Sequence, residues 1–275
     1  MAAIDGKVIF TKSDCYKSNK KMTPKGIVVH STGANNPNLK RYVQPDDGKI
    51  GKNENNNDFN NPGIDVCVHA FMGKDKNGDV KCYQTLPFDI CCWGVGSGSK
   101  GSYNYDPAYI QFEMCEDDLS DKAYCTAVYN KAVEFCAYLC KTYKLSVSNI
   151  VSHHEAGEKG YGSSHTDPDN WWSKHGYTMD KFRKAVTAAL KEKPRLDKSG
   201  YKKGDATIGM LSLKELLIIA KKLGINKYGM DKNKWYGDGT ERSINYLLSQ
   251  WGYSETGIAG ENFIKRLHTE IDKKI

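Results

Sequence analysis

KGIVVHSTG, at residues 25–33, is a short β-branched run that passes into a polar turn. The run predicts a buried strand ending at His30, and strand ends of this kind are where α/β folds open their binding sites. Two further strand-like runs lie at 66–72 and 80–86. The segment between them contains Asn-Gly turn chemistry, so the two runs are predicted to pair as a β-hairpin.

Residues 109–114, YIQFEM, alternate between two faces. Ile110, Phe112 and Met114 are predicted to face the core, which leaves Glu113 on the opposite face. Apolar residues recur at helical spacing at 121–143 and 179–190. Between them, residues 149–152 form one more short strand-like run. Strands that alternate with helices predict an α/β domain.

Two polar segments interrupt these patterns. Residues 34–63 are rich in Asn, Asp, Gly and Pro and predict a long surface loop, which in a compact domain is usually functional. Residues 193–205 are polar and predict a linker. Beyond it, residues 206–275 carry apolar side chains at helical spacing, with a capping signal at 238–240. We therefore expect an α/β domain at 1–192 and a small, mainly helical domain after the linker.

The composition excludes several classes of protein. Of the 275 residues 39% are hydrophobic, and no apolar run approaches the ~20 residues that a membrane-spanning helix needs. The N-terminal MAAIDGK lacks the basic and apolar pattern of a secretory signal, so we expect the chain to be made in the cytoplasm. Nine cysteines without a Cys-x-x-Cys pair predict that most are reduced and structural.

The positive charge is concentrated near the C-terminus. The net charge is +7, and residues 195–275 hold 15 Lys or Arg against 10 Asp or Glu. A basic domain suits a polyanionic surface such as nucleic acid, anionic lipid or a bacterial wall polymer. Nucleic acid is the least favoured because the region has no arginine cluster and no nucleic-acid motif. A solvated lysine-rich surface explains the charge equally well.

Several histidines stand where a metal site would need them. His30 ends the first strand, His153 and His154 follow the strand at 149–152, and residues 165–168 read His-Thr-Asp-Pro. A catalytic zinc ion takes about three protein ligands and keeps one position open. These segments could supply the ligands, with Glu113 as a general base. Each residue alone has a plainer interpretation, as a hydrogen-bonded histidine or a solvated glutamate.

The same segments resemble a known family. The chain is similar to the zinc-dependent N-acetylmuramoyl-L-alanine amidases, which share their fold with peptidoglycan recognition proteins. The resemblance covers about residues 20–190, and its motifs occur in order at 27–33, 67–73, 83–87, 110–113, 152–155 and 165–168. It implies a mixed central β-sheet flanked by helices. Within the family, the chain looks most like endolysins of phages that infect clostridia and related Gram-positive bacteria.

The resemblance implies a set of zinc ligands. Carried over by position, they are His30, His153 and Asp167. His153 is preferred to its neighbour because the family places this ligand two residues before an acidic residue, here Glu155. The reverse assignment, with His154 as the ligand, stays open.

The resemblance also implies two catalytic residues. Glu113 matches the general base, and His165 matches a position, often lysine, that assists the developing oxyanion. The chain departs from the family at Trp93-Gly94, where the family has Trp-His, and after Asp167-Pro168, where the family has glycine. His69 could line the substrate groove or simply pack in the domain.

The activity implied is zinc-dependent hydrolysis of the bond between N-acetylmuramic acid and L-alanine. The expected partners are peptidoglycan and wall polymers, without nucleic acid or membrane insertion. A phage or prophage endolysin would act on the wall after its release from the cytoplasm, with residues 206–275 as a wall-binding domain. The alternatives are a peptidoglycan-binding module that does not cleave, and a hydrolase of another wall peptide bond.

Overall fold

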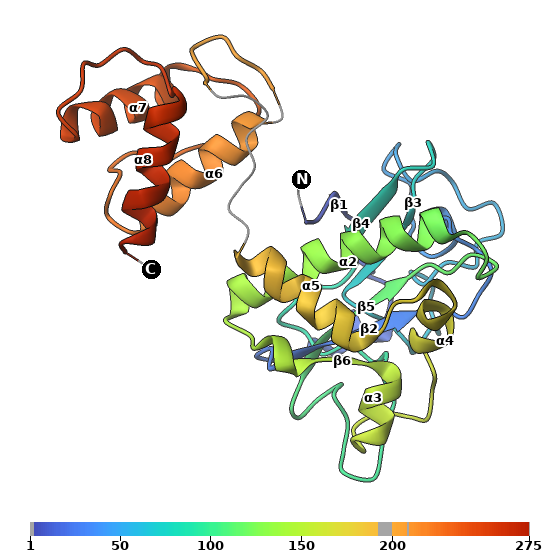
Figure 1. Cartoon of the computed structure of the whole chain (residues 1–275). Helices are drawn as coiled ribbons and strands as arrows, with labels where there is room; N and C mark the ends of the chain where they lie inside the picture. Colours follow the sequence, from blue (N-terminus) through green and yellow to red (C-terminus); the bar gives the residue numbers. More distant parts are fainter. Residues whose placement is uncertain (1–2, 192–199, 208, 275) are drawn as a thin grey trace. The chain divides into compact units, whose positions relative to one another are not determined.

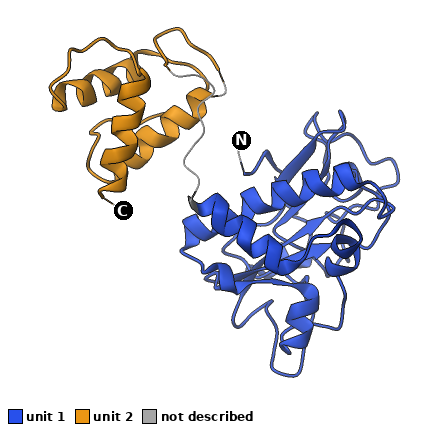
Figure 2. Cartoon of the chain, in the orientation of Figure 1, with its two compact units in different colours: residues 1–191 blue, residues 192–275 orange. Residues whose placement is uncertain are grey.

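The computed structural model describes residues 3–191, 200–207 and 209–274. The chain divides into two units, Met1–Lys191 and Glu192–Ile275, which Figure 2 shows in two colours. The predicted linker at 193–205 lies partly outside the described residues. No helix among the described residues has the length and apolar character needed to cross a membrane.

A six-stranded sheet is the frame of the first unit (Figure 1). In spatial order its strands are β1 (Gly6–Lys7), β4 (Val80–Gln84), β3 (Ala70–Lys74), β5 (Tyr109–Met114), β2 (Gly26–Ser31) and β6 (Ile150–Ser152). β3 and β4 form the predicted antiparallel hairpin, and all other neighbours are parallel. The predicted mixed sheet is confirmed.

Helices complete the first unit. They are α1 (Asp14–Ser18), α2 (Lys122–Tyr143), α3 (His153–Glu158), α4 (Asp169–Trp172) and α5 (Met179–Lys191), with short 3₁₀ turns η1 (Leu39–Arg41), η2 (Val147–Asn149) and η3 (Ser173–His175). Asp121 caps the first turn of α2 by accepting a hydrogen bond from the Tyr124 backbone. Thr178 likewise accepts from the backbone of Lys181 at the start of α5.

The alternation of β5 separates the two faces of the sheet. Ile110, Phe112 and Met114 pack with α2 and α5 in the main hydrophobic core, as predicted. Figure 1 shows these two helices lying over the sheet. The odd-numbered positions of β5 face the other side, where Tyr109 stacks on Tyr103 with ring centroids 4.0 Å apart. Glu113 therefore leaves the sheet on the face away from α2 and α5.

Two predictions for the N-terminal half need correction. The strand predicted at 66–72 begins only at Ala70, although the backbone N–H of His69 still donates to Gln111. The segment 34–63 is irregular as predicted, but Tyr42, Val43 and Ile50 are buried in a second hydrophobic cluster against the sheet. The short edge strand β1 had no sequence signal because it is only two residues long.

The cysteines fall into two groups, free and disulfide-bonded. Seven are free and buried, in keeping with the prediction for most of them. Cys15 on α1 and Cys67 before β3 form a disulfide between positions 52 residues apart. Partners so distant in sequence carry no local signal, so this bond was not predicted.

The second unit is a small helical domain. Its helices are α6 (Gly209–Lys222), α7 (Asp238–Gln250) and α8 (Glu261–Asp272). The predicted apolar faces meet in one core that includes Leu213, Leu247 and Leu267. The capping prediction at 238–240 is wrong: Asp238 is the first residue of α7, and its carboxylate contacts Lys203 rather than a backbone N–H.

Candidate metal centre

Three side chains from separate segments converge on the face of the sheet away from α2 and α5. His30 comes from β2, His153 from the first turn of α3, and Asp167 from the loop before α4. Their nearest nitrogen and oxygen atoms all lie within 4.8 Å of one another. The two Nδ1 atoms are 3.1 Å apart, and each lies 3.2–3.3 Å from an Asp167 oxygen.

Hydrogen bonds orient the His30 ring and select its tautomer. The backbone N–H of Val95 donates to Asn104 Oδ1, which also accepts from Gln111 Nε2. Gln111 therefore points its Oε1 at His30 Nε2, 3.1 Å away. Because a carbonyl oxygen only accepts, Nε2 carries a proton, and in a neutral ring Nδ1 then presents its lone pair to the site.

His153 is held in the same state. Its Nε2 lies 3.1 Å from the carbonyl oxygen of Val95, so Nε2–H donates there, which in a neutral ring leaves the lone pair on Nδ1. The start of α3 is fixed by a capping box between Ser152 and Glu155. Arg183 holds Glu155 through two nitrogen–oxygen contacts of 2.8 and 3.0 Å. The acidic residue that follows the histidine thus positions the helix that carries it.

The donor set fits a zinc ion. Zn–N and Zn–O bonds of 2.0–2.2 Å in a tetrahedron place neighbouring ligand atoms about 3.3 Å apart. The contacts of 3.1–3.3 Å between His30, His153 and Asp167 match this spacing. Two lone pairs and a carboxylate repel one another unless a cation lies between them.

His154 lies outside this cluster. Its Nδ1 is 2.9 Å from Asp169, and its side chain is 43% exposed, against 5% for His153. The Asp169 carboxylate raises the pKa of His154. The geometry therefore brings His153, and not its neighbour, to the other two predicted ligands.

Glu113 stands beside the cluster on β5. Its strand position pairs with that of His30 on β2. Its Oε2 atom is buried and has no hydrogen-bond partner among the described residues. Burial, together with the charges of Asp167 and Glu116, raises the pKa of Glu113 well above its usual value. An unpartnered carboxylate oxygen of this kind is suited to holding and releasing a proton.

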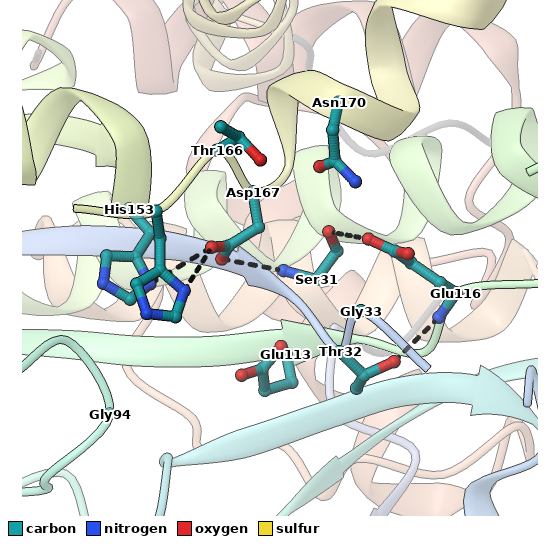
Figure 3. A pocket seen from close by; sticks show the side chains of 11 residues that line it. Ser31, Thr32, Gly33, Gly94, Glu113, Glu116, His153, Thr166, Asp167 and Asn170 are labelled. Atoms are coloured by element: carbon teal, nitrogen blue, oxygen red, sulfur yellow. Dashed lines mark hydrogen bonds and ion pairs between the residues drawn. The ribbon is translucent and has the colours of Figure 1, made fainter. Parts of the chain in front are cut away.

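A cavity of about 300 Å³ opens next to these residues (Figure 3). Figure 3 shows Asp167 between the His153 ring and the backbone of Ser31, whose N–H is 3.3 Å from the carboxylate. His165 is at the solvent side of the cavity, with its side chain 56% exposed and its ring stacked 4.2 Å from that of His153. The structure thus brings all five predicted site residues to one place.

Further residues of the site had not been predicted. Glu116 lines the cavity, is almost fully buried and accepts a hydrogen bond from Ser31 Oγ. Burial raises its pKa despite that hydrogen bond. Gln111 could have been found, because it lies on the same strand face as Glu113. Glu116 lies after the end of β5, where the alternation of side chains between two faces no longer predicts which way a side chain points.

Gly94 explains one departure from the family pattern. A Cβ atom at this position would lie 2.7 Å from Gln111 Oε1 and 2.8 Å from a methyl group of Val68. Gln111 thus occupies the space that a side chain at 94 would need. The missing family histidine and the glutamine that orients His30 are two parts of one local arrangement.

His69 packs inside the domain. It is fully buried, its Nδ1 accepts from the backbone N–H of Gln111, and its Nε2 lies 3.0 Å from the carbonyl oxygen of Ile90. Burial lowers the pKa of His69 to about 4. Of the two interpretations left open, packing is the one that the structure supports.

A family model described as N-acetylmuramoyl-L-alanine amidase matches residues 20–170, more than half of the chain. The chain belongs to this amidase family. The match contains all the residues of the candidate metal centre.

Two curated proteins are similar to the chain at low identity. A "Probable N-acetylmuramoyl-L-alanine amidase" from Bacillus licheniformis is 26% identical over 175 residues, which are 60% of this chain and 46% of the relative. "Protein Ami" from Listeria monocytogenes is 26% identical over 176 residues, which are 61% of this chain and 16% of the relative. The chain thus spans less than half the length of each of these relatives.

Solved structures also resemble the chain. Staphylococcus aureus hydrolase AmiA, in complex with its ligand, has a TM-score of 0.48 and 20% identity, covering 69% of this chain and 85% of its own. PlyL has a TM-score of 0.47 and 22% identity, covering 68% of this chain and 97% of its own.

Proposed function

We propose that the chain is a zinc-dependent N-acetylmuramoyl-L-alanine amidase that cleaves bacterial peptidoglycan, with the metal held by His30, His153 and Asp167. The observation that carries the proposal is the convergence of two ring-nitrogen lone pairs and a carboxylate next to the unpartnered oxygen of Glu113. Membership of the amidase family supports the choice of bond and substrate.

Each catalytic residue has a distinct task. A bound zinc ion supplies Lewis acidity, which lowers the pKa of water toward ~7 and polarises a carbonyl. Glu113 accepts the proton of the attacking water at Oε2 and returns it to the departing nitrogen of L-alanine. Its raised pKa favours keeping that proton between the two steps. His165, exposed at the cavity, donates a hydrogen bond to the carbonyl oxygen as negative charge develops there.

Product analysis tests this activity. Purified Gram-positive walls are digested with and without a zinc chelator, and new L-alanine amino termini and new reducing sugar ends are measured together. We expect alanine termini that the chelator abolishes, and no new sugar ends. New termini of another residue would assign a different wall peptide bond. Tight wall binding without any product would indicate a recognition module instead.

We also propose that residues 206–275 bind the wall and that the chain serves as an endolysin. Tethering raises the local concentration of substrate, so a wall-binding domain increases turnover on insoluble walls. The resemblance over residues 20–190 supports a phage or prophage of a clostridial-type host. A chain ending after residue 195 is expected to hydrolyse soluble muramyl peptides normally but to sediment less with walls. Equal sedimentation would contradict the wall-binding role.

A further inference from the structure

The second unit carries a trough of about 550 Å³ along the solvent-facing side of α7. Asn245 and Ser249 form its floor, at the four-residue spacing that puts residues on one helix face. Loop residues that precede and follow α7 form its sides. None of these residues is part of the metal centre, which lies in the first unit.

One side of the trough is aromatic and basic. The rings of Tyr228 and Tyr246 meet edge to face, with centroids 5.7 Å apart. Lys227 Nζ lies 4.6 Å from the Tyr246 ring, and the Arg242 guanidinium lies 5.9 Å from the Tyr228 ring. Cation–π contacts of this kind hold the charges in place while leaving their donors open to solvent. Within the described chain, neither cation has an ion-pair partner.

This side is built on a buried polar anchor. Asn226 is 3% exposed, and its Nδ2 donates to Ser243 Oγ of α7 at 2.7 Å. Its Oδ1 accepts from the backbone N–H of Tyr228. Because buried amides keep their hydrogen bonds, the loop that carries Lys227 and Tyr228 is fixed to α7 before any ligand arrives.

The other side of the trough is acidic. Asp238 and Glu241 lie one helix turn apart on α7, and Lys203 contacts both of them. Glu255 comes from the segment after α7 and has no ion-pair partner among the residues described. That segment is tied to the floor by the backbone N–H of Gly257, which donates to Asn245 Oδ1. The trough therefore offers free cations along one side and a free carboxylate on the other.

We propose that the α7 trough binds the peptide stems of peptidoglycan. The inference rests on the proposed action on the wall. It names a ligand for the second unit and the site on α7 where that ligand binds. A stem peptide carries both carboxylates and an amine, which complement Lys227 and Arg242 on one side and Glu255 on the other. A neutral glycan would leave these charges unmatched, and a polyanion would meet the acidic side.

The test uses the full chain with Glu113→Gln, which prevents cleavage. A sugar-free stem peptide is titrated, and the NMR signals of Asn245 and Tyr246 are followed, since these report on the trough and not on the metal centre. We expect saturable shifts, and an Arg242→Ala substitution should weaken this binding at least tenfold. Arg266→Ala is the control, because it removes an exposed arginine of the same unit that contacts Trp251 and Glu270 and does not line the trough. The control should change the affinity less than twofold.

Three outcomes would overturn the assignment: no shifts with the peptide, equal weakening by both arginine substitutions, or shifts with a sugar-only fragment or teichoic acid instead. Hydrolysis of a soluble muramyl peptide is measured in parallel with Glu113 intact. Arg266→Ala should leave this rate unchanged. Loss of hydrolysis in every chain, with Arg242-dependent peptide binding retained, would refute the amidase and keep the trough. Normal hydrolysis without such binding would refute peptide binding by the trough and leave the proposed amidase activity standing.

Discussion

His30 and Glu113 occupy paired positions on the adjacent parallel strands β2 and β5. Paired residues of neighbouring strands leave the same face of a sheet and lie about 5 Å apart at the backbone. The spacing between the proposed ligand and the proposed base is therefore set by the hydrogen bonds of the sheet. A site built on rigid strands keeps its geometry better than one built on loops.

Replacing Glu113 with Gln should abolish most turnover while zinc stays bound. The amide has a similar shape but cannot accept a proton, and loss of a general base typically costs 10²–10⁴-fold in rate. The rate of L-alanine release and the zinc content are measured on the same sample. Glu158→Gln, on the exposed end of α3, is the control and should stay active. A fully active Glu113→Gln chain would remove this residue from the mechanism.

The two adjacent histidines should respond differently to substitution. His153→Ala removes a ring nitrogen from the cluster and should leave the purified chain with little zinc. His154→Ala removes only contacts to Asp169 and Glu158 at the surface and should leave the zinc content near one per chain. Elemental analysis of both variants decides between them. Zinc loss in His154→Ala alone would reverse the assignment.

Gln111→Leu should weaken zinc binding without touching a ligand. The substitution removes the oxygen that keeps the proton of His30 on Nε2, and changes of this kind usually cost 10–100-fold in metal affinity. Competition with a chromophoric chelator measures the affinity. Gln84→Leu on β4 is the control, since the side chain of Gln84 donates a hydrogen bond to the backbone of Leu86 and is not part of the metal centre. Equal affinities in the two variants would show that His30 needs no such partner.

His69 predicts a loss of stability in mild acid. Its pKa is about 4 in the folded chain and about 6.5 when unfolded, so between these values the unfolded state binds more protons. Its contribution is present above pH 6.5 and is lost as the pH falls toward 4. Between pH 7 and pH 5 this amounts to about 2 kcal/mol in the free energy of unfolding.

The comparison that isolates His69 is urea unfolding of the parent chain and of His69→Gln at both pH values. The variant should be less stable at pH 7, because it loses a buried hydrogen bond. Its stability should fall by about 2 kcal/mol less than that of the parent chain on going to pH 5. Parallel losses in the two chains would mean that other groups cause the acid sensitivity.

Local patterns predicted the parts of the fold that depend on one segment at a time. The alternation at 109–114 gave the two faces of β5, and helical spacing gave α2 and α5. His30 was predicted at a strand end because β-branched residues stop there and polar ones begin. These features follow from short-range periodicity, which one segment contains in full.

Features that join distant segments were not predicted from pattern alone. The order of strands, the disulfide and the path from Val95 through Asn104 and Gln111 to His30 each depend on tertiary contacts. The ligand set itself came from a family resemblance, because spacing left His153 and His154 equivalent. The capping error at Asp238 has the same origin, since Lys203 lies 35 positions earlier in the chain.

The disulfide closes a covalent ring that contains β2 and the whole 34–63 segment. A protease that cuts once within that segment would separate the chain into two pieces on a reducing gel, yet leave them joined without reductant. His30 lies inside the ring, whereas Glu113 lies outside it. After a single cut, the strand that carries His30 would therefore stay covalently bound to the part of the chain that carries Glu113.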